Sequence, residues 1–262
     1  MSQEPQGWRR LVHAYWWIGL AGGLASGLFG IGGAVILVPL LARFLGLTQQ
    51  EAHGTSLAVA LFTAPAALIA YALKGHVDLS WALVLALGSV FGAPLGARWA
   101  NQTSAKTLRR AFGVLIILLG IRLALTHLPE GNLLPTVGVW AFVARVVMGF
   151  VVGVASGYFG VGGGTVLVPM LVLIAGLKQV EAQGISLLFV IPTAASGAWT
   201  HRKLGNVDGK SVLPLALWSM IGAFAAALVA TSLSGDLLRR IFSVFLFFTG
   251  LKLTFTKPKR PA

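Results

Sequence analysis

Cysteine is absent from this chain of 262 residues, which excludes disulfides, thiolate metal sites and a cysteine nucleophile. Acidic residues are scarce, with 7 of them against 20 lysines and arginines. The 5 histidines are scattered without ligand spacing, so neither a metal site nor a cofactor is expected. All charged residues together make up only 10% of the chain, whereas a soluble domain typically carries about 25%. A water-soluble enzyme is therefore a poor description of this sequence.

Apolar residues make up 56% of the chain, more than a globule of this size can bury. Residues 11–42 and 146–177 contain no charged side chain, and residues 79–97 and 211–235 are further uncharged runs. Such runs are about long enough to cross a hydrocarbon core of about 30 Å. The basic residues lie between these runs and at both ends, which favours contact with a lipid bilayer over binding of nucleic acid. We predict an all-α polytopic membrane protein.

The sequence is duplicated at an offset of 130 residues. Residues 25–33, with the sequence ASGLFGIGG, return as residues 155–163, with the sequence ASGYFGVGG. Each copy is followed by a Leu-Val-Pro triplet that ends at Pro39 or Pro169, and the register continues to Gly120 and Gly250. We predict a first membrane repeat at residues 1–126, a connector at 127–135 and a second membrane repeat at 136–262.

Each repeat contains a glycine-rich break followed by about three transmembrane helices. The segment after the first break, residues 34–47, would be only roughly 21 Å long as a helix, too short to cross alone. We therefore expect a broken helix or a hairpin that meets inside the membrane. The sequence leaves open whether the break is a re-entrant hairpin or a junction of two crossing segments.

Loop charges indicate the orientation, because basic residues accumulate on the cytoplasmic side. If each glycine break returns the chain to the side from which it came, fourteen of the twenty basic residues share one side. Equivalent loops also carry opposite biases: Lys74 stands alone where its counterpart has Arg202, Lys203 and Lys210. We therefore predict two inverted repeats with both termini on the cytoplasmic side.

The glycine breaks are the predicted substrate site. Irregular backbone at membrane depth requires a polar cavity or protein partners, and a helix that restarts there presents its partly positive N-terminal end. Two such ends that face each other would bind an anion without a buried cation. The residues expected to bind it are Ser26, Gly27, Phe29, Gly30, Gly32 and Gly33, their counterparts Ser156, Gly157, Phe159, Gly160, Gly162 and Gly163, and Ser56 and Ser186 from the following helices.

Further residues are assigned auxiliary roles. His53, Glu51 and Glu181 are candidates for proton coupling, although Thr48 to Glu51 also reads as a capping box. Pro39 and Pro169 are expected to form a helix break or hinge. Small-residue spacings such as Gly88, Gly92 and Gly96 are most simply explained by close helix packing.

The twin ASG-x-FG-x-GG motifs, each followed by Leu-Val-Pro, resemble the sulfite exporter TauE/SafE family of membrane transporters. The resemblance covers about residues 16–253. It implies a permease that moves small sulfur-containing anions, such as sulfite or organosulfonates, outward across the bacterial inner membrane. The motif glycines, serines and prolines transfer with the resemblance, whereas the identity of the substrate does not.

Charge supports the same substrate class, because a cation transporter would carry carboxylates along its path and the motifs contain none. The hypothesis is an anion transporter that works by alternating access, with Phe29, Phe159 and Tyr158 closing the site. An anion channel, or a transporter of small carboxylates, on the same scaffold are the alternatives. An enzyme is disfavoured, because no nucleophile–base pair, metal constellation or paired carboxylate is visible.

Overall fold

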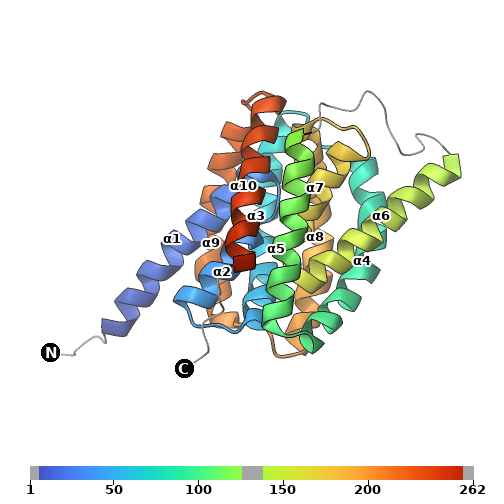
Figure 1. The fold of residues 1–262 in the computed structure, drawn as a ribbon. Helices are drawn as coiled ribbons and strands as arrows, with labels where there is room; N and C mark the ends of the chain where they lie inside the picture. The colour runs from blue at the N-terminus through green and yellow to red at the C-terminus, as the bar shows by residue number, and fades with distance from the viewer. Residues whose placement is uncertain (1–5, 126–137, 256–262) are drawn as a thin grey trace.

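The structure is a computed structural model that describes residues 6–125 and 138–255, and Figure 1 shows these residues as a bundle of helices without strands. The predicted connector, residues 127–135, lies outside the described residues. The ten helices of the described part are α1 (Gln6–Phe29), α2 (Ala34–Phe44), α3 (Gln49–Leu73), α4 (Leu79–Gln102), α5 (Ala105–Leu125), α6 (Gly138–Phe159), α7 (Gly164–Leu173), α8 (Gln179–Lys203), α9 (Gly209–Ala230) and α10 (Gly235–Phe255).

The helices have the lengths and surfaces of a membrane bundle. Helices α3, α4, α6, α8 and α9 are long and apolar enough to cross a bilayer, whereas α2 and α7 are apolar but short. Large apolar side chains such as Phe91, Trp140 and Leu213 face outward, where a soluble protein would place polar groups. The prediction of an all-α polytopic membrane protein is confirmed.

The first glycine break is a hairpin. The ring of Trp17, midway along α1, packs edge-on against that of Phe44 at the end of α2, with centroids 4.8 Å apart. Leu37 of α2 lies against Gly22 of α1, where a Cβ would come within 2.5 Å of the leucine side chain. Since α2 runs back along α1, this segment returns to the side from which it came.

Close helix pairs join the two halves of the chain. A Cβ on Gly23 of α1 would lie 2.1 Å from the carbonyl oxygen of Ser219 in α9. In the duplicated pair, a Cβ on Gly153 of α6 would lie 2.6 Å from the Cα of Ser89 in α4. Gly88, Gly92 and Gly96 of α4 likewise lie against the backbone of α6, which confirms close helix packing as their role.

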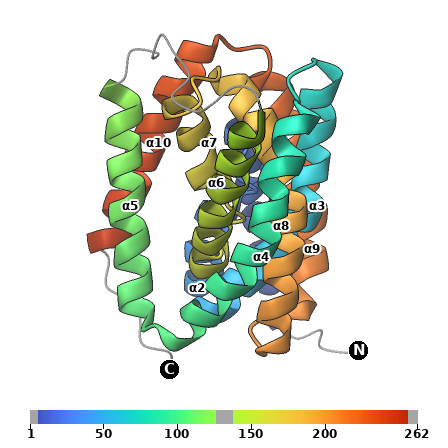
Figure 2. The same cartoon turned by 90° about the vertical axis from the view of Figure 1, so that its right-hand side faces the viewer.

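Duplicated helices run antiparallel to each other. Gly54 of α3 lies against the Cβ of His201 near the end of α8, and Leu57, one turn later, lies against Gly197, one turn earlier. Helices α5 and α10 also lie side by side (Figure 2), with Gly113 near Thr254 and Gly120 near Ser243. In both pairs, residue numbers increase along one helix while the numbers of the residues that it contacts decrease, so the two helices run in opposite directions.

Candidate functional site

Glycine alone allows the backbone path of the two breaks. Six glycines of the two breaks take positive φ, a region that costs residues with a Cβ about 1–2 kcal/mol each. They are Gly30, Gly32, Gly33, Gly160, Gly162 and Gly163. The last of each set, Gly33 and Gly163, is the residue immediately before α2 and α7. The glycines therefore end one helix and start the next within four residues.

The two breaks meet near the middle of α8. A Cβ on Gly32 would lie 3.1 Å from the nearest methyl of Val190, and one on Gly162 would lie 3.3 Å from the same methyl. A Cβ on Gly164, the first residue of α7, would lie 2.6 Å from the carbonyl oxygen of Gly30. The starts of α2 and α7 are thus brought together, and the first amide groups of each helix have no carbonyl acceptor within that helix. Their partial positive charges add in one place.

A serine from the opposite half holds each break. The hydroxyl of Ser186 in α8 donates to the carbonyl of Gly30 at 2.8 Å. The hydroxyl of Ser56 in α3 lies 2.7 Å from the carbonyl oxygen of Gly160 and 2.8 Å from that of His53. Both serines are fully buried, so these bonds form away from water. Ser56 and Ser186 were predicted as site residues, and they contact the breaks directly.

Other hydroxyls near the breaks are buried without a partner. Ser26 and Ser156, one turn before the two breaks, are fully buried, and neither side-chain oxygen has a hydrogen-bond partner. The same holds for Thr165 at the start of α7. A buried hydroxyl without a protein partner costs about 1–3 kcal/mol, so these three hydroxyls beside two helix starts can donate to a polar ligand.

Tyr71, Gln183 and His201 are buried polar residues without a predicted role, and together with His53 they complete the surroundings in a duplicated pattern. The hydroxyl oxygen of Tyr71 lies 3.0 Å from the Gly27 carbonyl oxygen and 2.9 Å from Oε1 of Gln183. At the other break, Nε2 of His201 lies 3.2 Å from the Gly157 carbonyl oxygen. Tyr71 and His201 are equivalent in the repeat, as are His53 and Gln183. Polar residues at the same register in two apolar helices were the signal that could have found them.

The motif aromatics pack against the outer helices. Phe29 stacks on Phe242 and Phe245 of α10, with ring centroids 5.2 and 4.6 Å apart. Phe159 packs on Phe112 of α5 with centroids 4.9 Å apart. A closing role for Phe29 and Phe159 stays a prediction, and it would involve movement of α10 and α5.

Gly27 and Gly157 lie in the helix contacts that lead to the breaks. A Cβ on Gly27 would lie 2.0 Å from the carbonyl oxygen of Ala223, and one on Gly157 would lie 1.9 Å from that of Ala93. Both therefore serve close packing, whatever they also contribute to a ligand.

The prolines lie inside helices rather than at the breaks. Helix α2 continues through Pro39 and α7 continues through Pro169. The helix break expected at these prolines lies instead at the glycines, because positive φ ends a helix more completely than the loss of one amide donor. A hinge at Pro39 and Pro169 stays a prediction.

The two glutamates differ in their surroundings. Glu51 forms the capping box of α3: its carboxylate accepts the Thr48 amide at 2.8 Å, and the Thr48 hydroxyl accepts the Glu51 amide at 3.2 Å. Its duplicate Glu181 follows Lys178, which cannot cap in this way. Helix capping explains Glu51 without proton coupling, whereas coupling through His53 or Glu181 stays a prediction.

The carboxylates of the described residues all lie at helix starts. They are Glu51, Asp78, Glu181, Asp208 and Asp236, each in the first turn or at the N-cap of its helix. None of these described carboxylates therefore lies at the meeting point of the breaks.

This fold defines an integral membrane protein with a buried polar break in each half. The sequence model of the sulfite exporter TauE/SafE family matches residues 2–123 and 145–262, and the chain belongs to this family of membrane transporters. It is 32% identical over 227 residues to a probable membrane transporter protein of Xylella fastidiosa strain 9a5c, covering 85% of this chain and 87% of the relative. It is 26% identical over 261 residues to the probable membrane transporter protein YunE of Bacillus subtilis strain 168, covering 91% and 95%. No solved structure matches the chain.

Proposed function

We propose that this protein carries small sulfur-containing anions, such as sulfite or organosulfonates, across the bacterial inner membrane by alternating access. One observation carries the proposal: the starts of α2 and α7 meet beside Val190, with the unpartnered hydroxyls of Ser26 and Ser156 one turn away. Amide and hydroxyl donors at two helix starts fit the oxygens of an anion. The family description supports sulfite as the first substrate to test.

Charge argues for an anion over a cation. An intramembrane cation site is normally built from carboxylates or from several carbonyl oxygens aimed at one point. Here the carbonyls of Gly30 and Gly160 already accept serine hydroxyls, and the described carboxylates lie at helix ends. The unpartnered hydroxyls of Ser26, Ser156 and Thr165 can donate to an anion there.

The arrangement of duplicated helices supports inverted repeats as the basis of alternating access. Helices α3 and α8 run antiparallel, and so do α5 and α10. In Figure 1 the beginning of α1 and the end of α10 lie at the same end of the bundle. The ends of α2, α4 and α8 share it and carry Arg43, Arg98, Arg202 and Lys203, so the positive-inside rule assigns this end to the cytoplasm.

A flux assay in proteoliposomes tests the substrate class and the transport mode together. Purified protein is reconstituted, and uptake of sulfite, sulfoacetate, sulfate and acetate is measured with and without a pH gradient. We expect saturable flux of sulfite or sulfoacetate. Flux that never saturates would indicate an anion channel, preference for acetate would indicate a carboxylate transporter, and absence of anion flux would refute the proposal.

A further inference from the structure

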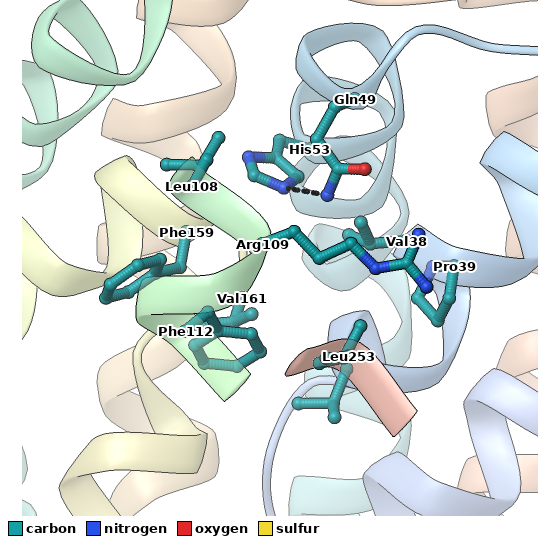
Figure 3. Close-up of a pocket in the computed structure, with 11 residues that line it drawn as sticks. Val38, Pro39, Gln49, His53, Leu108, Arg109, Phe112, Phe159, Val161 and Leu253 are labelled. Atoms are coloured by element: carbon teal, nitrogen blue, oxygen red, sulfur yellow. Dashed lines mark hydrogen bonds between the residues drawn. The ribbon is translucent and has the colours of Figure 1, made fainter. Parts of the chain in front are cut away.

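A small cavity lies beside the second glycine break, and its polar lining has no assigned role. Apolar side chains of α2, α5 and α10 form most of its wall, and Phe159 and Val161 at the second break close one side. Its polar groups are Gln49 and His53 of α3 and Arg109 of α5. Figure 3 shows the Arg109 side chain extending from α5 across the cavity toward Pro39, below Gln49 and His53.

Arg109 is a cation without a counter-charge in the described part of the chain. Its side chain is half-buried, and its Nε atom is buried without a hydrogen-bond partner. A guanidinium in apolar surroundings is costly unless it is paired. Guanidinium is also the side chain best shaped to hold two oxygens of an oxyanion at once.

Gln49 and His53 place further polar groups beside it. Nε2 of Gln49 lies 2.9 Å from Nε2 of His53. His53 is 2% exposed, and its Nδ1 has no hydrogen-bond partner. With one amide hydrogen of Gln49 bonded to His53, the second is free for a ligand.

The duplicated position shows what is unusual about Arg109. Its counterpart is Arg239, whose guanidinium pairs with Asp236 at 3.3 Å. The residue equivalent to Asp236 in the first half is Lys106, so this half has a second positive charge where the other half has a carboxylate. The same arginine is thus neutralised in one half of the protein and left uncompensated beside a cavity in the other.

We propose that Arg109, with Gln49 and His53, binds the transported anion in a vestibule next to the glycine breaks. The vestibule lies near the starts of α3 and α5, at the end of the bundle assigned to the cytoplasm, and contacts Val161 of the second break. The ligand is a compact oxyanion of the sulfite or sulfonate type, held by the guanidinium and the amide. The inference rests on the proposed function, and it adds a cytoplasmic capture step to it.

The test compares Arg109→Gln with Arg110→Gln, a control that removes the neighbouring, exposed arginine. We expect Arg109→Gln to raise the KM for sulfite flux about tenfold or more, because a charged hydrogen bond is lost. Arg110→Gln should stay within about twofold of the wild type. An unchanged KM in folded Arg109→Gln protein refutes the vestibule and identifies Arg109 as an interfacial anchor.

A second variant avoids removing Arg109. Lys106→Asp places a carboxylate three residues before Arg109, as Asp236 stands before Arg239, and Lys106→Asn is its control. The new carboxylate should occupy the guanidinium and raise the KM for sulfite, whereas the asparagine should raise it far less. Equal KM values in the two variants contradict the proposal.

Thermal unfolding of purified protein with sulfite, sulfoacetate or sulfate separates this inference from the proposed function. Stabilisation by one of these anions that is lost in Arg109→Gln supports the vestibule, even if the wild type shows no flux. Equal stabilisation of both proteins, or stabilisation of neither, overturns the vestibule. Absence of flux in the wild type counts against the proposed transport alone.

Discussion

Ser186 donates its hydroxyl hydrogen to the carbonyl of Gly30, a residue 156 positions earlier in the chain, at 2.8 Å. Ser56 makes the duplicated contact to Gly160 at 2.7 Å. Each glycine break is therefore hydrogen-bonded to a long helix of the other half, the first break to α8 and the second to α3. A shift of α3 against α8 would therefore move the two breaks relative to each other, which is the kind of displacement that the proposed alternating access needs.

Replacement of Ser26 or Ser156 by alanine is expected to weaken sulfite binding by about fivefold per hydroxyl, equivalent to about 1 kcal/mol. The physical reason is the loss of a donor that has no partner within the described protein. Equilibrium binding measures the change. Because a buried orphan hydroxyl is removed, stability should stay level or rise, and unchanged binding in both variants rules out their assigned role.

Gly32→Leu is expected to abolish transport, since its side chain would enter the meeting point of the breaks, where Val190 already lies close to the backbone. Gly32 also has positive φ, so the change adds backbone strain. Gly75→Leu is the matched control, because Gly75 has φ of 73° and no atom within 4 Å of its Cβ position. Full flux through folded Gly32→Leu protein would place the site elsewhere.

The inverted topology predicts that residues 74 and 202 lie on opposite sides of the membrane. The chain has no cysteine, so Lys74→Cys and Arg202→Cys each supply a single reactive thiol at an exposed position. Labelling of intact and permeabilised cells with a thiol reagent that cannot cross the membrane reads out the side. We expect Arg202→Cys to be protected in intact cells, and equal labelling of both variants would contradict inversion.

Gly149→Ala is expected to destabilise the protein by about 1–3 kcal/mol, because overpacking forces tightly packed helices apart. The new Cβ would lie 1.9 Å from the carbonyl oxygen of Leu85, so α4 and α6 must separate. Gly209→Ala is the control, since nothing lies within 4 Å of its Cβ position. Thermal unfolding in detergent compares the two, and equal midpoints would show that close contact of α4 with α6 is dispensable.

Asp78 should contribute pH-dependent stability at the start of α4. Burial acts to raise the pKa of Asp78, but hydrogen bonds from the Ser80 hydroxyl and the Trp81 and Ser80 amides outweigh it and lower the pKa. A lowered folded pKa means that the contribution is present above the ordinary aspartate pKa and is lost as pH falls through the folded value. Asp78→Ala should cost about 1 kcal/mol at pH 7. The unfolding midpoints of this variant and the wild type should converge in acid. A difference between the two midpoints that stays constant with pH would contradict stabilisation by the Asp78 carboxylate.

Much of the fold could be read from the sequence, because uncharged runs and duplicated glycines report directly on membrane helices and breaks. The predicted short segment at residues 34–47 became α2 (Ala34–Phe44). Sequence could not decide between a hairpin and a crossing, because that depends on contacts such as Trp17 with Phe44.

The site was harder to predict than the helices. Local patterns found the glycines and Ser56 and Ser186, since these recur in both halves. They could not show that the hydroxyls of Ser26 and Ser156 lack partners, because burial and pairing depend on helices far along the chain. The sequence shows Arg109 only as a basic residue duplicated at Arg239, and it is the three-dimensional structure that shows a cavity beside it.

The crosswise glycine contacts of α1 with α9 and of α4 with α6 have a consequence for biosynthesis. When the first half of the chain leaves the ribosome, the glycine-containing faces of α1 and α4 have no helix to pack against. The helices that cover these faces, α9 and α6, are encoded more than fifty residues later. Neither half can reach its final packing alone, so insertion into the bilayer must precede assembly. The native protein forms only when α9 packs against α1 and α6 packs against α4 within the bilayer.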